Sequence, residues 1–281
     1  MLSGPAKSKI RTRICQESAF PELTAGTTPV ISFGDFTTAR VLTLGINPSS
    51  REFFSGSKLL SPSKKRLVDL EALGLEKELT AVPKEMAEKV WTGCKNYFSL
   101  PSDRGAYTRN PNAYWTWFGP MQQVLDEAGA SYVDRTASHV DLVQWATRKA
   151  WSRVTSATRQ ALIEQDRAFL DWQLSQPNVE LILVNGRSAL KAVRENSSIL
   201  WLPSRSVAIK TGSIEKNYEL AWGVHSGGAM VAAWSINLQA AHFASGEMEE
   251  AIRLIAPIIR EASSQDRHAV RAYLFPDYLS D

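Results

Sequence analysis

Short runs of apolar residues recur along the chain, and each is followed by polar loop residues and then by a segment with helical periodicity. The runs cover residues 41–46, 140–145, 179–184 and 207–209. They are continuous rather than alternating, which is typical of strands that are buried on both faces of a parallel sheet. The pattern predicts an α/β fold, a three-layer α/β/α sandwich around a central, mostly parallel four-stranded sheet.

Apolar residues at helical spacing predict the helices that cover this sheet. These helices are expected at residues 117–128, 188–193 and 246–261. Near the end of the chain, Ser226-Gly227-Gly228 separates two β-rich runs at 219–224 and 229–236, which predicts a hairpin.

Residues 55–99 break the alternation of strands and helices. This stretch is charged and is predicted to be mostly helical, with one helix at 83–91. We interpret residues 1–281 as a single domain in which residues 55–99 form an insertion.

Composition narrows the class of protein. The chain of 281 residues is 44% hydrophobic and 22% charged, as in ordinary globular proteins. Its two cysteines, Cys15 and Cys94, are too few for a disulfide framework, a four-cysteine zinc site or an iron-sulfur cluster. No apolar run reaches the roughly 18 residues of a membrane helix. We therefore expect a cytoplasmic bacterial protein, a monomer without metal, cofactor or membrane contact.

The carboxyl end of the first run carries the most informative motif. Ligands of open α/β sheets bind outside the carboxyl ends of the strands. There the chain reads Gly45-Ile46-Asn47-Pro48, followed by Ser49. The segment resembles the water-activating motif of the uracil-DNA glycosylase superfamily, most closely the Gly-Ile-Asn-Pro-Gly form of its mismatch-specific branch, with Ser49 in place of the last glycine. The alternative is a common turn that only ends a strand.

This resemblance implies a DNA glycosylase, which hydrolyses the N-glycosidic bond of a flipped base and leaves an abasic site. Asn47 would hold the attacking water through its side-chain oxygen. The base would lie against Ile46 and stack on Phe53 or Phe54. No lysine is a convincing candidate for Schiff-base chemistry, so we expect a monofunctional enzyme.

The second strand is expected to supply the residue that reads the base. Uracil-specific members of the superfamily usually present an asparagine here, whereas this chain has Asp141. A carboxylate only accepts hydrogen bonds, so it suits the N4 amine and a protonated N3 of cytosine better than O4 of uracil. Alternatively, Asp141 is a structural cap and Gln144 reads the base.

A cytosine target points to a modified base, because removal of ordinary cytosine would be lethal to the host. Hydroxymethylated or glucosylated cytosine in bacteriophage DNA would fit, and a role in anti-phage defence would follow.

The last strand ends where the superfamily usually has a His-Pro-Ser or Asn-Pro-Ser motif. Asn237 is the best match to its first residue, Leu238 and Gln239 would wedge into the duplex, and His242 competes for the histidine role. The alternative for Asn237 is a cap on the following helix.

DNA is the expected partner, although a formal net charge of +3 requires its phosphates to meet local basic groups. The candidates, together with Ser49, are Lys58, Lys64, Lys65, Arg148 and Arg187. Three other functions stay open: a uracil or mismatch repair glycosylase, a non-catalytic DNA-binding relative, and a nucleotide-binding or nucleoside-hydrolysing enzyme. The last lacks support, since the chain has no P-loop and no Gly-x-Gly-x-x-Gly turn.

Overall fold

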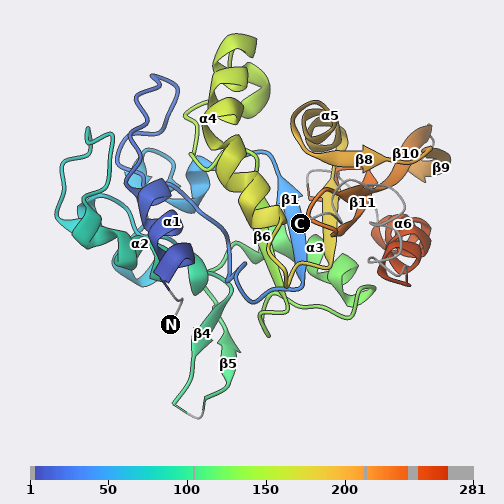
Figure 1. Ribbon diagram of the computed structural model, residues 1–281, viewed down its shortest axis with the longest axis horizontal. Coiled ribbons are helices and arrows are strands. Elements are labelled where there is room, and N and C mark those ends of the chain that lie inside the picture. Colours follow the sequence, from blue (N-terminus) through green and yellow to red (C-terminus); the bar gives the residue numbers. More distant parts are fainter. Residues whose placement is uncertain (1–3, 104, 212–213, 240–245, 265–281) are drawn as a thin grey trace.

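A mixed seven-stranded sheet forms the centre of the protein (Figure 1). The computed structural model describes residues 4–103, 105–211, 214–239 and 246–264. The strands follow one another in space as β6-β1-β7-β11-β10-β8, and β9 pairs with β10. Their bounds are β1 Val41–Gly45, β6 Ala137–Asp141, β7 Leu181–Asn185, β8 Ile199–Trp201, β9 Arg205–Thr211, β10 Ile214–His225 and β11 Met230–Trp234.

Four of these strands, β6, β1, β7 and β11, run parallel to one another. Every residue of β6, β7 and β11 is buried, as the continuous apolar runs predict. Gly45 pairs with Asp141 and Trp234 pairs with Asn185. The strands therefore end at the same edge of the sheet, and the loops that follow them gather there.

Antiparallel strands extend this parallel part on one side. The hairpin that the Ser226-Gly227-Gly228 turn predicts is present, with β10 antiparallel to β11. The run at 207–209 lies in β9, which is antiparallel to β10. Its expected place in the parallel sheet is therefore wrong, and within the described residues the sheet has seven strands rather than four.

Helices flank the sheet, and Figure 1 shows α5 and α6 on opposite sides of its β8–β10–β11 part. The α-helices are α1 Gly4–Ile14, α2 Ala87–Lys95, α3 Trp115–Asp126, α4 Ser156–Leu174, α5 Arg187–Asn196 and α6 Glu247–Ser264. α5 packs on β7 and β11, while α6 contacts β10, β11 and α3. The helices expected at 117–128, 188–193 and 246–261 are confirmed.

Residues 55–99 are not mostly helical, contrary to the prediction. They contain α2 and three short 3₁₀ turns, Pro62–Lys64, Glu71–Leu73 and Lys84–Met86. The small hairpin of β2 (Phe54–Ser55) and β3 (Lys58–Leu59) begins the segment. A second hairpin, β4 (Ser99–Pro101) and β5 (Tyr107–Arg109), follows it and projects from the body in Figure 1.

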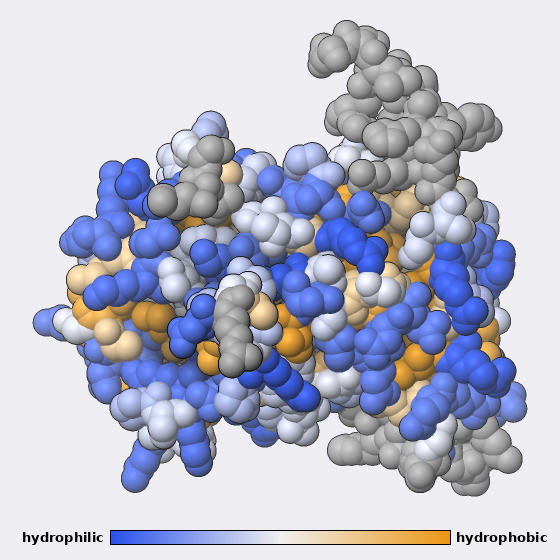
Figure 2. All heavy atoms as spheres, turned by 90° about the horizontal axis from the view of Figure 1, so that it is seen from below, coloured by the Kyte–Doolittle hydropathy of each residue, from blue (hydrophilic) through white to orange (hydrophobic). Residues whose placement is uncertain are grey.

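The surface is mainly polar on the face seen in Figure 2, where hydrophobic colour is confined to separate areas among the described residues. Large apolar side chains that are exposed lie scattered at Leu79, Leu100, Tyr107, Trp117 and Leu200. No helix within the described ranges is long and apolar enough to cross a membrane.

Candidate active site

A cavity of about 520 Å³ opens at the edge of the sheet where the four parallel strands end. Each of these strands, or the loop after it, contributes a polar side chain: Asn47 after β1, Asp141 at the end of β6, Asn185 at the end of β7, and Asn237 after β11. The volume falls in the range of ~300–1,000 Å³ that is usual for small-molecule sites. The carboxyl-end rule thus locates this cavity correctly.

Asn47 is held by its amide nitrogen. The Nδ2 group donates to the carbonyl oxygen of Pro48 and to Oγ1 of Thr147, both at 3.1 Å. The bond to Thr147 joins the loop after β1 to the loop after β6, and Thr147 in turn donates to the carbonyl oxygen of Lys149 within its own loop. Within the described residues, no hydrogen bond uses Oδ1 of Asn47, so this oxygen is available to orient a water.

Asp141 is part of a buried polar chain that crosses from β1 to β6. Oδ1 of Asp141 lies 3.3 Å from Nε2 of His139, and Nδ1 of His139 lies 2.8 Å from Oγ1 of Thr43. Oγ1 of Thr43 lies 2.6 Å from the hydroxyl of Tyr132. If Tyr132 donates to Thr43 and Thr43 donates to Nδ1, a neutral His139 carries its proton on Nε2 and donates it to Asp141. This arrangement leaves Oδ2 of Asp141 for a ligand.

The missing side chain of Gly45 leaves room for these buried polar side chains of β6. A Cβ atom at Gly45 would lie 2.4 Å from Oδ1 of Asp141 and 2.9 Å from Nε2 of His139. The glycine of the motif therefore has a steric role here: it lets two polar side chains of β6 approach the backbone of β1.

Glu52 is a carboxyl group of the cavity that the sequence analysis missed. It ends the 3₁₀ turn Ser50–Glu52, is only 2% exposed and lines the cavity. Its Oε2 accepts a hydrogen bond of 2.6 Å from the hydroxyl of Tyr97 and lies 3.8 Å from Nη1 of Arg66. Burial raises the pKa of Glu52 to about 7, although Tyr97 and Arg66 oppose the rise; the charge of Asp141 adds to it.

Phe33 and Phe118 are the phenylalanines that line the cavity. The expected stacking residues lie elsewhere: Phe53 is buried in the hydrophobic core, and Phe54 lies in β2 and packs against that core. Neither lines the cavity, because the 3₁₀ turn after Asn47 directs Glu52 rather than Phe53 into it. The ring of Phe33 lies 5.5 Å from that of His139 and 5.2 Å from that of Phe118.

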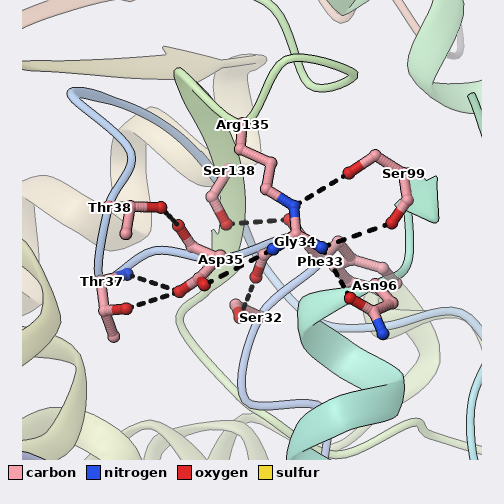
Figure 3. A network of polar contacts seen from close by, with 10 residues as sticks. All are labelled: Ser32, Phe33, Gly34, Asp35, Thr37, Thr38, Asn96, Ser99, Arg135 and Ser138. Atoms are coloured by element: carbon pink, nitrogen blue, oxygen red, sulfur yellow. Dashed lines mark hydrogen bonds and ion pairs between the residues drawn. The ribbon is translucent and has the colours of Figure 1, made fainter. Parts of the chain in front are cut away.

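A polar network holds the segment that carries Phe33 (Figure 3). The backbones of Phe33 and His139 exchange two hydrogen bonds of 2.8 Å, and Oγ of Ser138 donates to the carbonyl oxygen of Phe33. Nearby, Nη1 of Arg135 lies 3.9 Å from Asp35, and its guanidinium donates to Asn96 and Ser99. These bonds hold the segment in a fixed position beside β6.

Asn185 organises the end of β11. Its Oδ1 accepts from the indole of Trp234 at 2.8 Å and from the backbone N–H of Leu238 at 3.2 Å. Its Nδ2 donates to Gln239 at 3.0 Å and lies 3.5 Å from Oδ1 of Asn237. Both ends of the Asn185 amide are thus engaged in holding the loop.

The site residues predicted after the last strand have two different placements. Asn237 and Gln239 line the cavity, and Oδ1 of Asn237 accepts from the backbone N–H of Gln239, as in a capped turn. Leu238 is buried in the core at 1% exposure, so the structure corrects its expected role as a wedge. His242 lies outside the described residues.

Gln144 does not face the cavity. It is fully buried, its Nε2 donates to Gln173, and its backbone N–H donates to Asp166. This placement corrects the alternative in which Gln144 reads the base. Ile46, in contrast, is half-buried and lines the cavity as expected.

The expected DNA-binding residues lie at different distances from this site. Ser49 and Arg148 line the cavity; Oγ of Ser49 also accepts from the N–H of Arg51 and caps the 3₁₀ turn. Lys58, Lys64 and Arg187 are exposed but lie outside the cavity lining. Lys65 also lies outside the cavity lining, and its ammonium group pairs with Asp69 at 2.7 Å.

Comparison with known proteins adds no identity: no family model matches the chain, and no curated protein does.

Proposed function

We propose that this protein is a monofunctional DNA glycosylase on a uracil-DNA glycosylase-like α/β/α fold, and that it removes a flipped, modified cytosine. The observation that carries the proposal is that Asn47 and Asp141 open into one cavity while the amide nitrogen of Asn47 is committed to Pro48 and Thr147. Its free oxygen can direct a water at C1′ of the sugar. The glycosidic bond breaks through an oxocarbenium-like sugar, so an oriented water suffices as nucleophile.

The polar side chains of the cavity favour cytosine over uracil. Reading uracil requires a group that donates to O4 and accepts from N3–H, as an amide does. Gln144 points away, and both ends of the Asn185 amide are engaged. Asp141, with Oδ2 free among the described contacts, is left to accept from the N4 amine and from a protonated N3.

The cavity also has room for a substituent. Its lining also includes Thr147, Lys149 and Trp151, which offer a hydroxyl oxygen, an ammonium group and an aromatic ring. Such groups suit the hydroxyl groups of a hydroxymethylated or glucosylated cytosine. Phage DNA carries such bases, and a role in anti-phage defence would follow.

Base release from defined duplexes tests this function. Each duplex carries one uracil, one cytosine, one 5-hydroxymethylcytosine or one glucosylated 5-hydroxymethylcytosine, and alkali then cleaves abasic sites. We expect strand breaks only after alkali, only on modified cytosine, and none with Asn47→Ala. Breaks on uracil alone would identify a repair glycosylase, and DNA binding without breaks on any duplex would identify a non-catalytic relative.

Asp141→Asn tests the base reader. An amide can donate to O4 of uracil, so we expect the variant to lose activity on modified cytosine and to gain activity on uracil. An unchanged preference would overturn the assignment of Asp141.

A further inference from the structure

The contacts of Glu52 determine where its proton lies. The hydroxyl of Tyr97 accepts a hydrogen bond of 3.0 Å from the backbone N–H of Tyr114. Its own proton is therefore directed at Oε2 of Glu52, 2.6 Å away. Because Oε2 accepts this bond, a protonated Glu52 carries its hydrogen on Oε1. No hydrogen bond among the described residues uses Oε1.

We propose that Glu52 is the acid that protonates the departing base. The inference rests on the proposed function. It answers a chemical need of that function, because cytosine is a poor anionic leaving group and Asp141, as a carboxylate, has no proton to give.

The step balances as follows. The C1′–N1 bond breaks and its electron pair goes to the base, while the proton on Oε1 of Glu52 passes to N3. The base leaves as a neutral tautomer, with its N4 amine donating to the carboxylate of Asp141. The water held by Asn47 forms the new C1′–O bond, and one of its protons restores the carboxyl of Glu52.

Burial keeps a substantial fraction of Glu52 protonated near neutral pH. Three groups act on it: Tyr97 from the segment after α2, Arg66 from the loop after β3, and Asp141 from β6. Burial raises its pKa to about 7 despite the opposing contributions of Tyr97 and Arg66. Acids whose pKa lies near the working pH are the most effective proton donors.

Single-turnover base release between pH 5.5 and 8.5 tests this role on the 5-hydroxymethylcytosine and glucosylated duplexes. We expect the wild-type rate to fall as pH rises above about 7. Glu52→Gln keeps an acceptor for Tyr97 but has no proton to lose, so its rate should drop roughly 100-fold or more and lose this alkaline decline. Glu88→Gln, an exposed site on α2, is the matched control and should behave like the wild type.

One further measurement separates proton donation from a structural role. Tyr97→Phe removes a hydrogen bond that lowers the pKa of Glu52, so the alkaline decline should move to higher pH. Tyr97→Phe also keeps the test decisive if Glu52→Gln does not fold.

The outcomes distinguish the two proposals. Wild-type protein that releases no base from any duplex overturns the proposed function, and the role of Glu52 with it. Active wild type with an equally active Glu52→Gln overturns the role of Glu52 alone. The role of Glu52 alone is also overturned if Glu52→Gln is slow but keeps the alkaline decline, or if Tyr97→Phe leaves the decline in place.

Discussion

At the scale of single residues, the cavity has two carboxyl groups in different surroundings. Asp141 receives a hydrogen bond from His139 on Oδ1 if the histidine is neutral, which leaves Oδ2 to accept from a ligand. Glu52 lies almost completely buried beside the ring of Tyr97, where the neutral acid is favoured. Carboxyl groups that hold different protonation states at one pH can divide the roles of acceptor and donor.

The buried carboxyl of Glu52 also predicts a pH dependence of folding. Its pKa is raised from 4.5 to about 7, so the folded state holds a proton that the unfolded state releases between these values. The contribution of Glu52 to stability is therefore fully present below pH 4.5. It is lost as pH rises through 7, and the free energy of unfolding falls by up to about 3 kcal/mol. Glu52→Gln removes the ionisation, and its stability relative to wild type should grow by about this amount between pH 4.5 and 8.

Urea denaturation across that pH range measures the difference. Glu88→Gln is the control: its carboxylate is 57% exposed, and its stability should follow that of the wild type at every pH. A constant difference between Glu52→Gln and wild type would contradict the raised pKa.

Some site residues could be predicted from the sequence, and others could not. Asn47 and Asp141 follow from the motif and from the ends of apolar runs. His139 could also have been predicted, because residues two apart on a strand share a face, and this places it beside Asp141. Glu52 could not have been predicted, since a glutamate in a loop normally lies in water. It is buried here, where its carboxyl group accepts a hydrogen bond from Tyr97, 45 residues away in sequence.

At the scale of elements, the apolar runs locate β1 and β7 well but displace β6. The expected strand at 140–145 is β6 at Ala137–Asp141. Ser138 and His139 are polar, so they hide the start of the strand, although both are buried. Beyond Asp141 the apolar run continues into a buried loop, whose backbone bonds to Gly45 and Ile46.

The longest helix among the described residues, α4, was missed for a related reason. It buries Asp166 and Gln173 among its apolar residues, and these polar positions weaken the helical pattern. Each has a partner that is distant in sequence: Asp166 pairs with Arg13 of α1, and Gln173 bonds to Gln144 and to the carbonyl oxygen of Ile31. A hydrophobic pattern cannot predict burial that depends on such partners.

The close approach of β1 and β6 at Gly45 predicts the effect of a single methyl group. In Gly45→Ala, the Cβ atom would displace Asp141 and His139, which lie 2.4 and 2.9 Å from its position. We expect a loss of about 1–3 kcal/mol in stability and at least a tenfold loss of base release. Thermal unfolding and single-turnover rates measure the two effects.

Gly93→Ala is the matched control for this variant. Gly93 lies in α2, away from the cavity. A Cβ atom there would lie 2.9 Å from a methyl group of Val68. Any change in its stability should leave base release intact. Full activity of folded Gly45→Ala would show that the base reader does not depend on this spacing.

At the scale of the whole molecule, charge is nearly balanced, with 32 lysines and arginines against 29 aspartates and glutamates. Long-range attraction to DNA is therefore weak, and contacts with phosphates must come from individual lysine and arginine side chains close to the bound DNA. Three exposed cations, Arg51, Arg148 and Lys149, line the cavity. Of these, Arg148 also donates to the carbonyl oxygen of Pro21, whereas Arg51 and Lys149 have no ion-pair partner among the described residues.

This distribution predicts how salt weakens DNA binding. Each phosphate contact contributes about −0.9 to the slope of log Kobs against log salt concentration. If Arg51 and Lys149 each meet a phosphate, Arg51→Ala and Lys149→Ala should each reduce the slope by about 0.9. Binding to a duplex with a stable abasic-site analogue measures it without requiring catalysis. Lys89→Ala, on α2, is the matched control, because α2 contributes no residue to the cavity. Equal slopes for all three variants and wild type would mean that DNA does not approach the mouth of this cavity.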